Sequence, residues 1–123
     1  MIRDSFFYLA VTFMLLHEMD AVRCREWRIF PGLSLLEDEV GFRVFMLAHL
    51  PLYGLLFWVM MGQSTTSGAI RGLDLFFVVH LVLHLLYLKH PKNEFRDTLS
   101  WVFIAGAAMA GLADLLVSLR AGE

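Results

Sequence analysis

Four histidines and two acidic residues lie inside or at the ends of long apolar segments, where polar side chains are rare. They are His17, Glu18, Asp20, His49, His80 and His84. Polar groups in apolar surroundings are costly unless they are paired or bind a metal. Neutral imidazoles combined with a carboxylate form the ligand sets of zinc, iron, manganese and copper sites. We therefore predict a transition-metal site, with zinc or iron as the expected ion.

The spacing of these residues supports a shared site. His80 and His84 are four positions apart, which places both imidazoles on one face of a helix, as two-histidine metal sites require. His17 and Asp20 are three positions apart and also share a face, whereas Glu18 points about 100° away from His17. The predicted metal ligands are His17, Asp20, His49, His80 and His84. Glu18 or Asp20 is the predicted catalytic group that would move a proton.

The same residues are also compatible with roles that need no metal. A single histidine in an apolar helix often serves as a hydrogen-bond partner between helices. The whole group fits a polar network or a proton path as well. We expect Glu18 and Glu26 to pair with arginines of the adjoining loop, unless one of them reaches the site as a general base.

The composition indicates which elements position these residues. Of the 123 residues, 59% are hydrophobic and 18% are charged, whereas soluble domains average about 45–50% and about 25%. A soluble domain of this size cannot bury so much apolar surface. The net charge of −2 argues against nucleic acid as a partner, and the single cysteine forms no internal disulfide. The expected surroundings are therefore membrane lipid.

Four segments have the length and composition of membrane spans. A helix needs roughly 20 mostly apolar residues to cross a hydrocarbon layer of about 30 Å. The segments are about 5–22, 40–61, 72–89 and 98–119. The first reaches this length only if the helix continues through His17, Glu18 and Asp20, and the loop 23–39 is too polar to span. The sequence thus predicts one all-α domain, an integral membrane four-helix bundle.

The basic residues predict the orientation of the spans. Seven lie on the side of the first and third loops: Arg23, Arg25, Arg28, Arg43, Lys89, Lys92 and Arg96. Three lie on the other side: Arg3, Arg71 and Arg120. In a cell inner (cytoplasmic) membrane the positive-inside rule then places both termini outside.

The depth of each histidine follows from the predicted ends of the spans. At a rise of about 1.5 Å per residue, His17 and His84 lie roughly 8 Å deep, and His49 and His80 roughly 14 Å deep. The four histidines therefore fall in one layer, in the cytoplasmic half of the bundle.

The fourth span carries a face of small residues. It is formed by Gly106, Ala110 and Ala113, together with Gly111. Small residues allow helix backbones to approach closely. The face therefore predicts tight packing of this span, and a bundle of four short spans is compatible with a homodimer.

Motifs follow the spans in order along the chain. They are His17-Glu18-Met19-Asp20-Ala21, Glu26-Trp27-Arg28, His49-Leu50-Pro51-Leu52, and the pair His80 and His84. In these motifs the chain resembles an uncharacterised family of small, four-span, mostly bacterial membrane proteins. The resemblance covers nearly the whole chain and implies a four-helix membrane fold. It implies no activity, so the functional hypotheses rest on the residues.

Three classes of function fit the pattern. The leading hypothesis is a membrane metalloprotein, a metal-dependent hydrolase or oxidoreductase acting on a lipid or another hydrophobic small molecule. The second is an electron carrier with haem b held by His49 and either His80 or His84, which leaves His17 and Asp20 unexplained. The third is a metal or proton transporter, or an accessory subunit of a larger complex. Transport is disfavoured because the polar residues concentrate in one half of the membrane.

Overall fold

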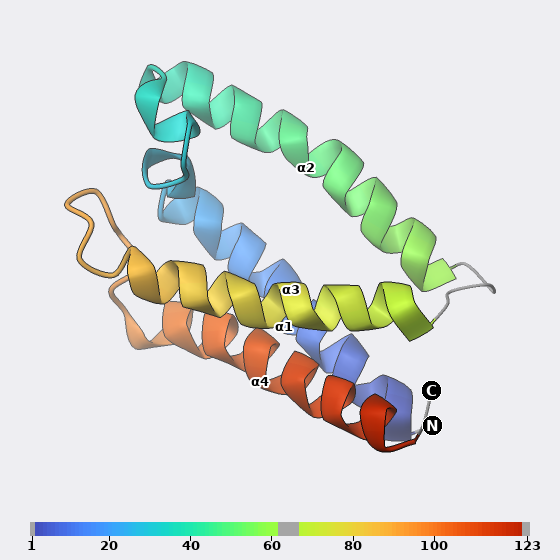
Figure 1. Ribbon diagram of the computed structural model, residues 1–123. Helices are drawn as coiled ribbons and strands as arrows, with labels where there is room; N and C mark the ends of the chain where they lie inside the picture. Colours follow the sequence, from blue (N-terminus) through green and yellow to red (C-terminus); the bar gives the residue numbers. More distant parts are fainter. Residues whose placement is uncertain (1, 62–66, 122–123) are drawn as a thin grey trace.

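The computed structural model describes residues 2–61 and 67–121 and contains four long helices in that part of the chain (Figure 1). They are α1 (Ile2–Arg23), α2 (Asp38–Met61), α3 (Ser67–Leu86) and α4 (Thr98–Arg120). Two short 3₁₀ helices, η1 (Glu26–Arg28) and η2 (Leu33–Leu35), lie between α1 and α2. Each long helix is long and apolar enough to cross a membrane. The prediction of an all-α protein with four helices suited to cross a membrane is confirmed in the described part of the chain.

The helix bounds differ from the expected spans mainly in α3, which begins at Ser67 rather than 72 and ends at Leu86 rather than 89. Its early end has a local cause. Pro91 disfavours helical geometry in the residue before it, and the Asn93 side chain donates a hydrogen bond to the free Leu88 carbonyl at 3.1 Å. The chain then turns, and Asp97 caps α4 by accepting a hydrogen bond from the Ser100 main-chain N–H at 2.8 Å.

Helices α1, α3 and α4 pack against one another, with α4 in contact with both of the others. The small residues of α4 make this close approach possible. A Cβ at Gly106 would lie 3.0 Å from the Phe13 ring of α1, and a Cβ at Gly111 would lie 3.1 Å from the Phe77 ring of α3. In the predicted small-residue face, Ala110 and Gly111 are buried and Gly106 and Ala113 are partly buried, and Gly106 and Gly111 allow the close packing of α4 against α1 and α3.

Helix α2 leans away from the other three helices (Figure 1). Its main contacts are with η1 and η2 at its N-terminal end. Of its most apolar stretch 17% is buried, against 22% in α3 and 39% in α1 and in α4. The four helices thus form a compact unit of three and one outlying helix that is held chiefly by the loop before it.

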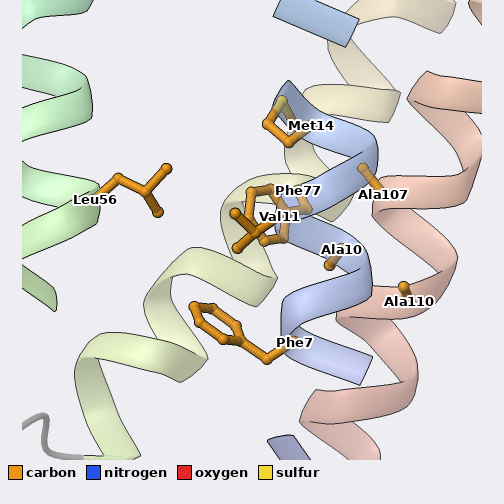
Figure 2. Packing of buried hydrophobic residues seen from close by; sticks show 8 residues of the cluster. All are labelled: Phe7, Ala10, Val11, Met14, Leu56, Phe77, Ala107 and Ala110. Carbon is orange, nitrogen blue, oxygen red and sulfur yellow. The ribbon is translucent and has the colours of Figure 1, made fainter. Parts of the chain in front are cut away.

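Two apolar clusters occupy the interior. The first contains Phe7, Ala10, Val11, Met14, Leu56, Phe77, Ala107 and Ala110. Figure 2 shows seven of these side chains on α1, α3 and α4, with Leu56 extending toward them from α2. The second cluster contains Ala21, Cys24, Trp27, Ile29, Phe45, Phe95 and Ile104. Phe95 and Ile29 of this second cluster lie beside the polar residues that are described next.

Candidate metal centre

Four residues that can ligate a metal meet near the end of α1. They are His17 of α1, Glu26 of η1, and His80 and His84 of α3. One ligand atom from each lies within 4.8 Å of the corresponding atoms of the other three. All four residues are buried, and His17 is completely inaccessible. We call this group the histidine–glutamate cluster.

The helix geometry brings the three imidazoles together. His80 and His84 lie one turn apart on the same face of α3, with ring centroids 4.6 Å apart. The ring of His17 on α1 packs against both, with its centroid 4.6 Å from that of His80 and 4.9 Å from that of His84. The predicted one-face arrangement of His80 and His84 is therefore present in the structure, and α1 supplies the third imidazole.

Glu26 reaches the cluster because the chain reverses direction after α1. Arg25 adopts a left-handed backbone conformation, with φ 51° and ψ 52°, which is uncommon for residues other than glycine. The next residues form η1, which is held from the other side by Asp38 at the start of α2. Asp38 accepts a hydrogen bond from Trp27 Nε1 at 2.9 Å and two from the Arg28 guanidinium at 2.7 Å. Asp38 thus fixes the turn that points Glu26 inward.

The loop between α3 and α4 covers the cluster with an aromatic side chain. Phe95 is 1% exposed, and its ring centroid lies 5.4 Å from that of His17 and 4.7 Å from that of His84. Asn93 positions Phe95 by accepting a hydrogen bond from its main-chain N–H at 3.0 Å. The loop therefore separates the imidazoles from the polar end of the bundle.

The charges in the cluster suit a cation. Glu26 Oε1 lies 3.2 Å from His84 Nε2 and 3.8 Å from His80 Nε2, and Oε2 lies 3.7 Å from His17 Nε2. Burial by itself would raise the pKa of Glu26, but the imidazoles of His80, His84 and His17 outweigh burial and lower this pKa below its usual value. Glu26 is therefore a carboxylate at neutral pH, which is the form that binds a metal.

Several imidazole nitrogens make no hydrogen bond within the described part of the chain, although Nε2 of His84 and Nε2 of His17 lie near the carboxylate of Glu26. Among the described residues, no hydrogen-bond partner is found for Nδ1 and Nε2 of His17, Nδ1 of His80 or Nε2 of His84. Buried polar atoms of this kind cost about 1–3 kcal/mol each when they remain unpaired. A tetrahedral ion with bonds of about 2.0–2.1 Å needs ligand atoms roughly 3.4 Å apart, close to the distances between Glu26 and the histidines. The donor set thus fits a metal ion.

The structure brings together three of the five ligands that we predicted from the sequence, namely His17, His80 and His84. Asp20 contacts α4 instead: it accepts hydrogen bonds from the Ser100 hydroxyl and from Arg23 Nε, the latter at 2.7 Å. Asp20 therefore connects α1 to the start of α4, and it is not among the four clustered residues.

His49, the fifth predicted ligand, pairs with Glu18. His49 Nε2 lies 2.7 Å from Glu18 Oε2, and Nδ1 lies 2.6 Å from the Phe45 carbonyl oxygen. A carbonyl oxygen only accepts, so Nδ1 carries a proton and donates it. Both ring nitrogens of His49 are thus occupied. The pair connects α2 to α1, and we call it the Glu18–His49 pair.

Glu26 is the clustered residue that the sequence did not single out as a ligand. We expected Glu18 and Glu26 to pair with arginines, but the ion pairs described for both glutamates are with histidines. One signal was present in the sequence: Glu26 is followed by Trp27 and soon by Ile29, and apolar residues next to a charge in a polar loop indicate burial. Helical periodicity could not have placed it, because α1 ends at Arg23.

The comparisons with known proteins give a family and no activity. No curated protein matches the chain, and no solved structure matches it. The profile of one protein family matches residues 3–121, nearly the whole chain. This family is described as a family of unknown function, DUF6713. The resemblance to an uncharacterised family that the motifs indicated is thereby confirmed, and the chain belongs to the DUF6713 family.

Proposed function

We propose that the protein is an integral membrane metalloprotein whose histidine–glutamate cluster binds one transition-metal ion. The observation that supports this most directly is the convergence of His17, Glu26, His80 and His84 from three separate segments within 4.8 Å. Unpaired imidazole nitrogens in a buried site add to it, because a metal ion would use the atoms that the protein leaves without partners. Zinc and iron are the ions that best match three imidazoles and one carboxylate.

An ion fits the cluster better than haem b does. Two axial histidines must lie on opposite faces of the haem, but the three imidazoles contact one another edge to face, with centroids 4.6–4.9 Å apart. No pair of them leaves space for a flat macrocycle between its rings. His49 is engaged by Glu18 and by the Phe45 carbonyl. The arrangement therefore favours an ion that all four side chains share.

We further propose that the metal serves an enzymatic reaction on a lipid or another hydrophobic molecule. Because the four side chains would fill a tetrahedral zinc ion, a water acidic enough to act as a nucleophile near neutral pH would need a fifth coordination position, and iron would supply oxygen chemistry on a hydrocarbon. The chain's own contribution is to hold the carboxylate of Glu26 among the imidazoles and to exclude bulk water with Phe95. By the positive-inside rule, we place this end of the bundle on the cytoplasmic side of the inner membrane.

Elemental analysis of detergent-purified protein, prepared without chelators, tests the metal site. We expect about one zinc or iron ion per chain in the wild type. The Glu26→Gln and His84→Ala variants should lose most of this metal, because each removes a ligand. Glu18→Gln and His49→Ala are matched controls, since they change the same residue types in the Glu18–His49 pair, and both should retain it.

Two results would contradict this proposal. Wild-type protein that binds no metal when zinc or ferrous iron is supplied would leave the cluster as a polar network. Retention of metal by Glu26→Gln together with its loss from Asp20→Asn would instead support the ligand set predicted from the sequence.

A further inference from the structure

A hollow of about 120 Å³ reaches the histidine–glutamate cluster from outside. Glu26, His80 and His84 line its inner end. Two hollows lined mainly by polar and charged residues lie near the same end of the bundle, around Arg28 and Lys92, and neither contains a residue of the cluster. The cluster is therefore accessible through a hollow that is separate from these polar ones.

The walls of this hollow are apolar apart from the cluster itself. They are formed by Ile29, Phe30 and Pro31 from the segment after η1, and by Leu83 and Tyr87 from the end of α3. Among the described residues that line the hollow, Glu26 is the charged one. A surface of this kind favours an apolar ligand, because each buried CH₂ group contributes about 0.8 kcal/mol.

The hollow opens beside the outer surface of a membrane-spanning helix. Leu83 lies in the span Gly68–Leu86 and is 42% exposed, and Phe30, which also lines the hollow, is 48% exposed. Outward side chains of a span face lipid chains. Leu83 is close to the end of this span, so the mouth lies at the margin of the hydrocarbon layer, where the polar and apolar parts of a lipid meet.

From this geometry we propose that the metal site receives its substrate laterally from the lipid phase, through the opening between Leu83 and Phe30. The substrate class is an amphiphile that carries one metal-binding oxygen group next to an apolar chain. The oxygen group reaches Glu26, His80 and His84, while the chain lies against Ile29, Leu83 and Tyr87. This inference rests on the proposed metal site and adds the route to it and the chemistry of its ligand.

Two hydroxamates of different chain length test the route on the full chain in detergent, with cobalt(II) supplied to the metal-free protein as a visible probe. Octanohydroxamate and acetohydroxamate carry the same metal-binding group, but only the first has a long apolar chain. Binding is followed by the change in the cobalt spectrum. We expect octanohydroxamate to bind the wild type at least about tenfold more tightly, a difference that the burial of two CH₂ groups would already supply.

Substitutions at the mouth separate this route from simple partitioning into detergent. Leu83→Trp narrows the opening, so it should remove most of the preference for octanohydroxamate, while acetohydroxamate, which carries only a methyl group beside the metal-binding group, still passes and keeps its affinity. Leu85→Trp is the matched control, because Leu85 is 52% exposed on the same helix and does not line the hollow. This variant should keep the preference. Phe30→Ala widens the opening and should also keep it.

The outcomes distinguish the two proposals. A protein that gives no cobalt spectrum overturns the metal site and the route together. A cobalt spectrum with equal affinity for the two hydroxamates overturns the route alone. A preference that survives Leu83→Trp, or that Leu85→Trp abolishes to the same extent, also overturns it.

Discussion

The histidines of the three-helix unit (α1, α3 and α4) differ from the histidine of the outlying helix α2 in how their ring nitrogens are hydrogen-bonded. In the three-helix unit, His17, His80 and His84 are buried beside Glu26 with ring nitrogens that have no hydrogen-bond partner among the described residues. On α2, His49 uses both ring nitrogens, one on Glu18 and one on the Phe45 carbonyl. The first arrangement leaves ring nitrogens available to the proposed metal ion, whereas in the second both ring nitrogens are engaged within the protein.

This difference teaches how to separate a binding site from a structural contact in a membrane protein. Both groups combine imidazole with carboxylate inside apolar surroundings, so residue type and burial do not distinguish them. The pairing of the individual nitrogen atoms does. A structural pair satisfies its polar atoms internally, whereas a metal site keeps lone pairs for the ion.

The largest expected effect tests this contrast in metal-free protein. His49→Leu should lower the free energy of unfolding by about 2–3 kcal/mol, because it leaves the Glu18 carboxylate buried without its partner. His17→Leu should cost little or even stabilise, because it replaces unpaired buried nitrogens with an apolar side chain of similar size. Unfolding in mixed detergent and SDS micelles measures both. Equal losses in the two variants would show that the nitrogens of His17 have partners after all.

A pair of glycines compares the packing of the two regions. Gly106→Val should destabilise by about 1–3 kcal/mol, because the added atoms meet the Phe13 ring and overpack the α1–α4 contact. Gly54→Val on α2 should have no such cost, because nothing lies within 4 Å of a Cβ at that position. The same unfolding measurement applies. If Gly54→Val lowered the free energy of unfolding by the same amount, α2 would be packed against another protein surface in the membrane at this position.

A smaller, pH-dependent effect is expected at the start of α4. The Ser100 main-chain N–H and then the Arg23 guanidinium lower the pKa of Asp97 below its ordinary value. The stabilisation by the charged form is therefore complete above the unfolded pKa of about 3.9, and it is lost as pH falls through the folded value. Asp97→Asn keeps a capping side chain but loses the charge.

The melting temperatures of wild type and Asp97→Asn, measured from pH 7 to pH 3, check this sign. The melting temperature of the wild type should exceed that of Asp97→Asn by a constant difference down to about pH 5, and this difference should shrink below about pH 4. A margin that grows as the pH falls would contradict the assignment.

The smallest effect is expected on α2. Arg43 and Glu39 form an ion pair at 3.0 Å, but their side chains are 71% and 60% exposed. Exposed ion pairs on helices contribute little because solvent screens them. Arg43→Ala should therefore leave the unfolding midpoint unchanged, and a clear loss of stability would mean that this part of α2 is covered by a partner.

The sequence was sufficient for the helices and for three of the four residues of the cluster, His17, His80 and His84. Hydropathy identifies a span because every residue facing lipid must be apolar, whichever neighbours it has. For the same reason hydropathy could not show that α2 leans away, since lipid and protein neighbours select similar side chains. The spacing of His80 and His84 fixes their common face, so this part of the cluster was predictable.

Which of the other polar residues join the cluster depends on the direction in which each side chain points, and the sequence does not give this direction. Depth counting placed His49 in the same layer as the other histidines, but depth does not tell which way a side chain points around its helix. Asp20 shares a face with His17, yet the Ser100 hydroxyl and Arg23 engage it. Glu26 lies near the imidazoles because Arg25 adopts a left-handed backbone conformation. This conformation is uncommon in residues other than glycine, so an arginine in the sequence does not predict it.

That single turn makes the site sensitive to the length of a connection. The carboxylate of Glu26 follows α1 after only Cys24 and Arg25, and Asp38 holds the far side of the same turn. One residue inserted or deleted between Arg23 and Glu26 would leave all four membrane helices with their full length and composition. It would nevertheless rotate the carboxylate out of the cluster. Natural or engineered length changes in this connection should therefore separate membrane insertion from ligand assembly within one chain.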